Sequence, residues 1–343
     1  MNSISSLVLP PFSALYGLLT RARLIAYREG LLETSKLDAP VISIGNITTG
    51  GTGKTPLVEW VSRAIAAEGK RVCVLTRGYR RANPGKRLVV SDGQQILAGV
   101  EEAGDEPLLL ARKLKGLAAV VCDSDRWQAG NWAQKNLAVD AFVLDDGFQH
   151  FRLARNLDIV TIDATSPYGG ANLLPYGQLR EPLSAASRSD CIIITRSEFC
   201  DDLDELKRHL QSVSADRPIF ISEMRAEGFR TIDALNVDLE SIPKAVAAFC
   251  GVGNPESFYA HLKRQQFTLT FTHSYRDHHA YTQTDIDFLA RQATQSGAKA
   301  LVTTAKDAVK LESLNLRLPC FVLEIEIAIE EGANLLKLIR RAL

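Results

Sequence analysis

Short runs of apolar, mostly β-branched residues alternate with amphipathic stretches along most of this 343-residue chain. Each short run suits one buried strand, and each amphipathic stretch repeats its apolar residues at helical spacing. This alternation is typical of α/β proteins with a doubly wound, mostly parallel sheet and helices on both faces, an α/β/α architecture. The predicted strands are 41–44, 71–76, 117–122, 141–144, 158–163 and 191–195, and the predicted helices are 56–67, 108–114, 127–136 and 203–213.

A second, smaller α/β series follows, and we place the boundary between the two near residue 217. Residues 1–217 are predicted to form the first domain, and residues 218–327 a smaller domain that closes over it. The C-terminal segment 328–343 is a candidate to join the first domain. The predicted strands of the second series are 218–225, 245–250, 268–272, 300–304 and 320–327, and the predicted helices are 255–264, 284–296 and 332–342.

Residues 12–32 are predicted to form an amphipathic helix. No run approaches 18 apolar residues, so no membrane-spanning helix is expected, and the first residues lack the basic character of a secretory signal. Two interpretations are open: a helix that lies in a membrane interface, and a helix that packs on the domain. The apolar stripe contains Phe12, Leu15, Tyr16, Leu18, Leu19, Ala22, Leu24, Ile25, Ala26 and Tyr27, and the basic side contains Arg21, Arg23 and Arg28.

The segment 45–56, GNITTGGTGKTP, joins the first predicted strand to the first helix of the series. A glycine-rich turn with Gly-Lys-Thr at the start of a helix is typical of a P-loop, because its amides and the helix N-terminus attract phosphate oxygens. Lys54 would contact phosphates and Thr55 would bind Mg²⁺. Thr48 stands where the strict pattern has its first glycine, and a glycine-rich turn with a chance lysine is the alternative. The predicted nucleotide-binding residues are Thr48, Thr49, Gly50, Gly51, Thr52, Gly53, Lys54 and Thr55.

Two pairs of neighbouring carboxylates extend this hypothesis. Asp145 and Asp146 end an apolar strand, as the metal-binding carboxylate of P-loop proteins does; the alternative is a simple turn. Asp105 and Glu106 precede a helix, where they could act as a base and a metal ligand or merely cap the helix.

Composition limits the other possibilities. Forty basic and forty acidic residues cancel, so no overall field favours nucleic acid. The six cysteines are scattered without a C-x-x-C pair and are expected to be reduced core residues rather than disulfides or zinc ligands. The segment 276–281, RDHHAY, offers histidines that could orient or accept a proton, or could be a solvated loop. Arg77 and Arg180 could hold phosphates, although single arginines are usually solvated.

Several of these motifs together resemble the tetraacyldisaccharide 4′-kinase family, the lipid A 4′-kinases of Gram-negative bacteria. The resemblance rests on the P-loop, Arg77-Gly-Tyr79, Glu101-Glu-Ala-Gly-Asp-Glu-Pro107, Leu144-Asp-Asp-Gly-Phe-Gln-His150, Leu179-Arg-Glu-Pro-Leu183 and Asp277-His278. It implies transfer of the γ-phosphoryl group of ATP, with Mg²⁺, to the 4′-hydroxyl of a tetraacylated glucosamine disaccharide 1-phosphate, forming lipid IVA. It also implies a peripheral protein on the cytoplasmic face of the inner membrane, held by its N-terminal helix.

The resemblance assigns roles position by position. Lys54 and Thr55 bind phosphate and Mg²⁺, and Thr55, Glu106, Asp145 and Asp146 form the metal shell, with the contacting aspartate left open. Asp105 resembles the group that accepts the hydroxyl proton, paired with His278 or, less favoured, His279. The substrate-binding residues are Arg77, Gln149, His150 and Arg180.

Two rival functions remain at this point. A regulatory P-loop NTPase or metal-insertion chaperone should carry a guanine-reading Asn/Thr-Lys-x-Asp, whereas Thr304-Ala-Lys-Asp307 has these residues at the wrong spacing. A non-catalytic, membrane-anchored nucleotide sensor would not need Asp105 beside Glu106. No feature points to an obligate protein partner.

Overall fold

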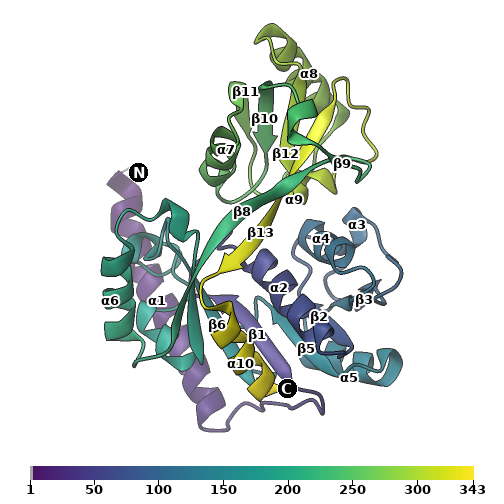
Figure 1. Cartoon of the computed structure of the whole chain (residues 1–343). Coiled ribbons are helices and arrows are strands. Elements are labelled where there is room, and N and C mark those ends of the chain that lie inside the picture. Colours follow the sequence, from purple (N-terminus) through teal and green to yellow (C-terminus); the bar gives the residue numbers. More distant parts are fainter. Residues whose placement is uncertain (1–2) are drawn as a thin grey trace.

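The computed structural model describes residues 3–343, and the strands in this range form one 13-stranded sheet that runs through two lobes (Figure 1). In the first lobe the order is β3-β4-β2-β5-β1-β6-β7-β8, and every neighbouring pair except β3 with β4 is parallel. The central strand β1 lies between β5 and β6, which brings the ends of these three strands together. The strands are β1 (Val41–Asn46), β2 (Val72–Thr76), β3 (Leu88–Ser91), β4 (Ala118–Cys122), β5 (Ala141–Asp145), β6 (Leu157–Asp163), β7 (Cys191–Thr195) and β8 (Ile219–Thr231).

Helices cover both faces of this sheet because successive strand residues point to opposite sides. Ile42 and Ile44 of β1 pack in one core with α2 and α4, whereas Val41 packs in another with α5. A third core joins β6 and β7 to α6. The helices of this lobe are α2 (Lys54–Ala67), α3 (Val100–Ala103), α4 (Asp105–Lys113), α5 (Arg126–Leu137) and α6 (Leu203–Val213). The predicted doubly wound α/β architecture of this lobe is therefore observed.

Two long antiparallel strands connect the lobes. β8 begins beside β7, with Ile219 opposite Ile192, and then pairs with β13 (Cys320–Ile329) from Ser222 to Thr231. The sheet thus passes through the predicted boundary near 217 without a break. Whether residues 218–327 form a separate unit stays a prediction.

The second lobe continues the sheet in the order β13-β12-β10-β11, with parallel pairing. Its elements lie close to the predicted ranges. They are β10 (Ala245–Cys250), α7 (Pro255–Arg264), β11 (Thr268–Ser274), α8 (Gln283–Gln295), β12 (Ala300–Thr304) and the short helix α9 (Ala305–Ala308), with a two-residue strand β9 (Asn236–Val237) beside β8.

The N-terminal helix α1 is Ser3–Arg28, so it begins earlier and ends earlier than the predicted 12–32. Pro10 and Pro11 lie within it and do not end it. One face packs on the first lobe: Ser13 Oγ donates to the carbonyl oxygen of Leu173 at 2.7 Å, and the Tyr27 ring lies 5.6 Å from that of Phe151. The opposite face is apolar and exposed, at 56% for Phe12, 54% for Leu15, 64% for Leu18, 61% for Leu19 and 55% for Ile25. In the part of the chain that the structure describes, no helix is long and apolar enough to cross a membrane.

The C-terminal helix α10 (Gly332–Ala342) returns to the first lobe, where it lies near β1 and β6 (Figure 1). Leu335 and Ile339 belong to the same core as Ile42, Ile44 and the apolar side of α2.

Replacing Leu335 by alanine tests the contribution of this packing. The side chain is fully buried, so Leu335→Ala should lower the free energy of unfolding by about 2–5 kcal/mol through lost burial and a cavity. Leu235→Ala, at a position that is 67% exposed, is the matched control and should change it by about 0.5 kcal/mol or less. Urea unfolding of the three proteins measures both values, and equal stabilities would show that α10 contributes little.

Candidate active site

A cavity of about 760 Å³ lies between the two lobes. The P-loop and the ends of β2 and β5 line it from the first lobe, and residues that follow β10, β11 and β12 line it from the second. Tyr16, Thr20 and Arg23 of α1 also contribute to its wall. The cavity thus lies at the carboxyl ends of parallel strands, where open α/β sheets bind their ligands.

The P-loop is held in place by contacts on both sides. Thr49 N donates to the carbonyl oxygen of Gln178 at 2.7 Å, and Thr195 Oγ1 donates to that of Thr52 at 2.9 Å. Thr48 forms an isolated bridge with Leu179, so the departure from the strict glycine pattern coincides with a pairing to a neighbouring segment. Gly53 has φ 74°, a left-handed conformation suited to glycine, and a Cβ there would lie 2.6 Å from Met224 Cε.

The second lobe touches the P-loop directly. A Cβ on Gly253 would lie 2.8 Å from Gly51 N, so only glycine allows the two backbones to come this close. The segment Gly251-Val-Gly-Asn254 after β10 is thus part of the contact between the lobes, and Val252, Gly253 and Asn254 line the cavity.

Lys54 and Thr55 begin α2 and line the cavity. Lys54 Nζ lies 3.3 Å from Asp146 Oδ1, and Arg180 Nη1 donates to the two oxygens of Asp146 at 2.9 and 2.8 Å. Burial alone would raise the pKa of Asp146, but Lys54 and Arg180 outweigh it and hold that pKa well below its usual value. A phosphate that binds Lys54 would therefore compete with Asp146 for the ammonium group.

Asp145 lies next to Asp146, but nearby positive charge does not outweigh the effect of burial on its pKa. Its Oδ2 accepts a 2.9 Å hydrogen bond from Thr76 Oγ1. Burial, together with the nearby Glu106 and Asp146, raises the pKa of Asp145 to about 6. Crowded carboxylates of this kind fit a divalent cation, which would neutralise them.

The residues present also fit the way in which magnesium is usually held. Within residues 3–343, no group of three or more histidine, cysteine or acidic side chains is arranged to hold a metal by itself. Mg²⁺ typically uses one or two carboxylates together with nucleotide phosphates, so a full protein cage is not required. The assignment of Thr55, Glu106, Asp145 and Asp146 to the metal stays a prediction.

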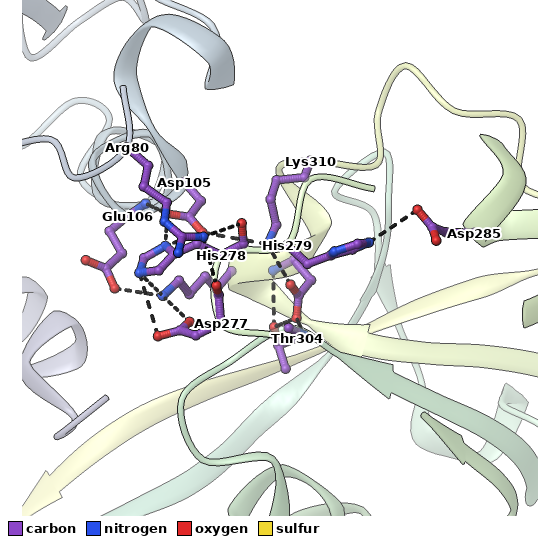
Figure 2. Close-up of polar contacts among 12 residues, drawn as sticks. Arg80, Asp105, Glu106, Asp277, His278, His279, Asp285, Thr304 and Lys310 are labelled. Carbon is purple, nitrogen blue, oxygen red and sulfur yellow. Dashed lines mark hydrogen bonds and ion pairs between the residues drawn. The ribbon is translucent and has the colours of Figure 1, made fainter. Parts of the chain in front are cut away.

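Asp105 and His278 meet across the gap between the lobes, as Figure 2 shows. Asp105 is the first residue of α4, and His278 follows β11, yet His278 Nδ1 lies 2.8 and 2.9 Å from the two Asp105 oxygens. Burial alone would raise the pKa of Asp105, but the His278 hydrogen bond and the charges of Lys306 and Lys310 lower it to about 2. Asp105 is therefore an ionised hydrogen-bond acceptor at neutral pH.

The neighbouring histidine points elsewhere. His279 Nε2 lies 3.2 Å from Asp285 Oδ2, at the N-terminus of α8 (Figure 2). The His279 ring also stacks on that of Tyr275, with 4.2 Å between the ring centroids. Of the two histidines, His278 is thus the one that reaches Asp105.

The four predicted substrate-binding residues differ in position. Arg77, Gln149 and Arg180 line the cavity. Gln149 Nε2 donates to the carbonyl oxygen of Asn46 and to Glu181 Oε1, both at 2.9 Å. His150 is not among the described residues that line the cavity, its Nε2 is buried without a partner among them, and burial lowers its pKa to about 3.

Sequence reasoning missed a lysine at this site. Lys306 Nζ donates to Glu106 Oε1 at 2.8 Å and to Asp277 Oδ1 at 3.1 Å, so it joins the two lobes. Arg80 also crosses the gap, because its Nη1 donates to the carbonyl oxygen of Asp277 at 3.1 Å. The available signal was Thr304-Ala-Lys-Asp307 after a strand, which we weighed only as a guanine-reading motif.

Comparison with known proteins identifies the family. The LpxK model, described as tetraacyldisaccharide-1-P 4′-kinase, matches residues 5–343. The chain belongs to this family. The tetraacyldisaccharide 4′-kinase of Pelobacter propionicus is 40% identical over 341 residues, which cover 98% of this chain and 92% of that protein. That of Desulfotalea psychrophila is 38% identical over 315 residues, covering 91% and 89%.

A solved structure agrees with the sequence relatives. LpxK from Aquifex aeolicus in complex with ATP has a TM-score of 0.78 and 33% identity, and the match covers 97% of each chain. This likeness confirms the predicted α/β fold class, and membership of the LpxK family disfavours the regulatory NTPase and chaperone alternatives.

Replacing Asp145 by asparagine tests the charge crowding at the end of β5. Because the pKa of Asp145 is raised from 3.8 to about 6, the folded state holds the proton more tightly, and ionisation above about pH 6 destabilises it. Asp145→Asn should therefore raise the Tm of the nucleotide-free protein at pH 7.5 by roughly 2 °C or more, and the gain should shrink toward pH 4. Asp233→Asn, at an exposed position, is the control. Thermal unfolding at both pH values measures the effect, and a lower Tm at pH 7.5 would contradict it.

Proposed function

We propose that this chain is an ATP-dependent tetraacyldisaccharide 4′-kinase of lipid A biosynthesis. It transfers the γ-phosphoryl group of ATP to the 4′-hydroxyl of a tetraacylated glucosamine disaccharide 1-phosphate, and the product is lipid IVA. Family membership supports this reaction. The observation that carries the proposal is that His278, which lines the same cavity as the P-loop, is paired with Asp105, because a nucleotide switch needs no such proton acceptor.

The P-loop side of the cavity would bind the nucleotide. Its backbone amides and the N-terminus of α2 suit phosphate oxygens, and Lys54 would exchange Asp146 for phosphate. Thr55, Asp145, Asp146 and Glu106 would hold Mg²⁺, which neutralises charge on the transferring group when bound. Positioning and charge compensation are the main requirements of phosphoryl transfer.

Asp105 would accept the proton of the 4′-hydroxyl as its oxygen forms the new bond to phosphorus and the bond to ADP breaks. With a pKa near 2, Asp105 is ionised but weakly basic, so we assign it proton transfer late in the step, when the hydroxyl has become acidic. His278 would hold this carboxylate in place. Of the four predicted substrate-binding residues, Arg77, Gln149 and Arg180 line the cavity and would bind the sugar and phosphate groups of the acceptor. The lobes together would exclude water and limit ATP hydrolysis.

Mass spectrometry of the acceptor lipid tests the proposed reaction. The purified chain, Mg-ATP and a tetraacylated disaccharide 1-phosphate should give a product heavier by one phosphoryl group. Lys54→Ala should lower kcat by roughly 10²–10³-fold, the scale of one lost electrostatic contact at the transition state. ATP hydrolysis with no phosphorylated lipid would instead support a regulatory NTPase.

A four-member cycle tests the pair of Asp105 and His278. Asp105→Ala and His278→Ala should each lower kcat by roughly 10²–10⁴-fold at saturating ATP and lipid, the range for loss of a general base. The double variant should be far more active than the product of the two losses predicts, because groups that act as a unit are not additive. His279→Ala is the matched control, since His279 contacts Asp285 instead. Multiplicative losses would mean that the two residues act independently.

We also propose that α1 places the enzyme on the cytoplasmic face of the inner membrane. Its exposed large apolar residues, flanked by Arg21, Arg23 and Arg28, suit the interface between headgroups and acyl chains. Its other face contributes to the cavity wall through Tyr16, Thr20 and Arg23, so a lipid could enter from the membrane surface.

Charging the exposed face of α1 tests this location. The double variant Leu15→Asp, Leu19→Asp should reduce binding to phosphatidylethanolamine–phosphatidylglycerol vesicles by roughly tenfold or more, since burying each leucine contributes about 1.5–3 kcal/mol. Leu235→Asp, on another exposed leucine, should bind as the unaltered chain does. Sedimentation with vesicles measures binding, and unchanged Tm values confirm folding. Equal binding of both variants would show that α1 serves only to pack on the lobe.

A further inference from the structure

Lys306 contacts the imidazole of His278 on the side opposite to Asp105. Its ammonium nitrogen lies 3.5 Å from His278 Nε2, while His278 Nδ1 lies 2.8 Å from Asp105 Oδ1. The same ammonium group is anchored by Glu106 Oε1 at 2.8 Å and Asp277 Oδ1 at 3.1 Å, and its side chain is only 16% exposed. The imidazole is therefore placed between a carboxylate and a fixed positive charge.

This placement decides which ring nitrogen carries the proton of a neutral imidazole. A lysine ammonium group has three donors and no acceptor, so it disfavours a proton on Nε2 and favours a lone pair there. The proton then lies on Nδ1, where it is donated to Asp105. Asp277 Oδ2 would favour the opposite tautomer, but it lies 3.6 Å from Nε2, beyond hydrogen-bond distance, and its other oxygen accepts from Lys306.

The turn that carries Lys306 also holds the backbone of His278. Thr304 caps α9, with its Oγ1 accepting from Asp307 N at 3.1 Å and donating to Asp307 Oδ2 at 2.7 Å. Asp307 Oδ2 accepts from Gly251 N at 2.9 Å, and Gly251 O accepts from His278 N at 3.2 Å. His278 has φ 61°, a left-handed conformation that a histidine adopts only where its surroundings hold it. The segment Thr304-Ala-Lys-Asp307 thus reaches both the ring and the backbone of His278.

We propose that Lys306 is the positioning residue of the Asp105–His278 pair, which it keeps in the tautomer that donates from Nδ1 to Asp105. This inference rests on the proposed kinase function for its effect on rate, but the tautomer itself does not depend on that function. Without the ammonium group, Asp277 would lose its partner and become free to accept a proton from Nε2. The imidazole would then turn toward Asp277 and release the carboxylate of Asp105 from its fixed orientation.

The test combines nitrogen-15 NMR of labelled histidine with steady-state kinetics on the full-length chain. Protonated and unprotonated ring nitrogens have different shifts, and His278→Gln assigns the His278 signals. The nucleotide-free wild type should show a protonated Nδ1 and an unprotonated Nε2. Lys306→Met should move the proton to Nε2 and lower kcat roughly 10–100-fold, less than the roughly 10²–10⁴-fold expected for a lost base, with the KM for ATP nearly unchanged. Lys306→Arg, which keeps a cation, should restore the wild-type tautomer and part of the rate.

Matched variants keep the outcome decisive. Lys299→Met removes an exposed lysine of the same lobe and should leave both the tautomer and kcat unchanged. Lys306→Gln is the second variant if Lys306→Met does not fold. An unchanged tautomer in folded Lys306→Met or Lys306→Gln overturns the proposal, whatever happens to the rate, and so does a changed tautomer with normal kcat. A wild type that fails to phosphorylate the lipid would refute the proposed function, and the NMR signals would still decide the tautomer.

Discussion

The geometry of the site depends on the hydrogen-bonded ladder between β8 and β13. These two strands carry one sheet from the first lobe into the second, with pairing from Ser222 to Thr231. A ladder of backbone hydrogen bonds fixes direction far better than a flexible linker does. It therefore allows the start of α4 and the loop after β11, which are distant in the sequence, to present Asp105 and His278 to each other.

Ion pairs also join the two lobes in several places across the gap where Asp105 meets His278. Lys306 pairs with Glu106, Lys113 Nζ lies 3.0 Å from Glu324 Oε2, and Arg112 pairs with Glu312. Within the first lobe, Lys54 pairs with Asp146. Removing one partner of a buried ion pair leaves the other charge buried and unpaired, which costs free energy. A ligand therefore enters such a site by replacing one partner of the pair. A nucleotide phosphate and a metal are well suited to this exchange. The phosphate can replace the carboxylate as the partner of the ammonium group, and the metal can replace the ammonium group as the partner of the carboxylate.

The packing of α1 is the reverse of that of an ordinary surface helix. A surface helix normally buries its large apolar residues and exposes its polar ones. Here the small or polar residues Ser13 and Gly17 pack inward, whereas Phe12, Leu15 and Leu19 face outward. An exposed apolar face of this kind generally marks an interaction surface. The two interpretations of the sequence, packing on the domain and contact with a membrane, are thus compatible, because they concern different faces.

The sequence by itself determined the elements whose signals are local. Apolar runs and helical spacing located most strands and helices, and the glycine-rich turn before Lys54 located the P-loop, because backbone conformation and periodicity are properties of neighbouring residues. The ends of α1 were predicted wrongly, because the helix continues through Pro10 and Pro11 and ends at Arg28. Tertiary structure alone decided that His278 rather than His279 reaches Asp105, that Lys306 lies on the other side of that ring, and which face of α1 is exposed. Each of these depends on contacts between segments far apart in the chain, and no local pattern encodes such distances.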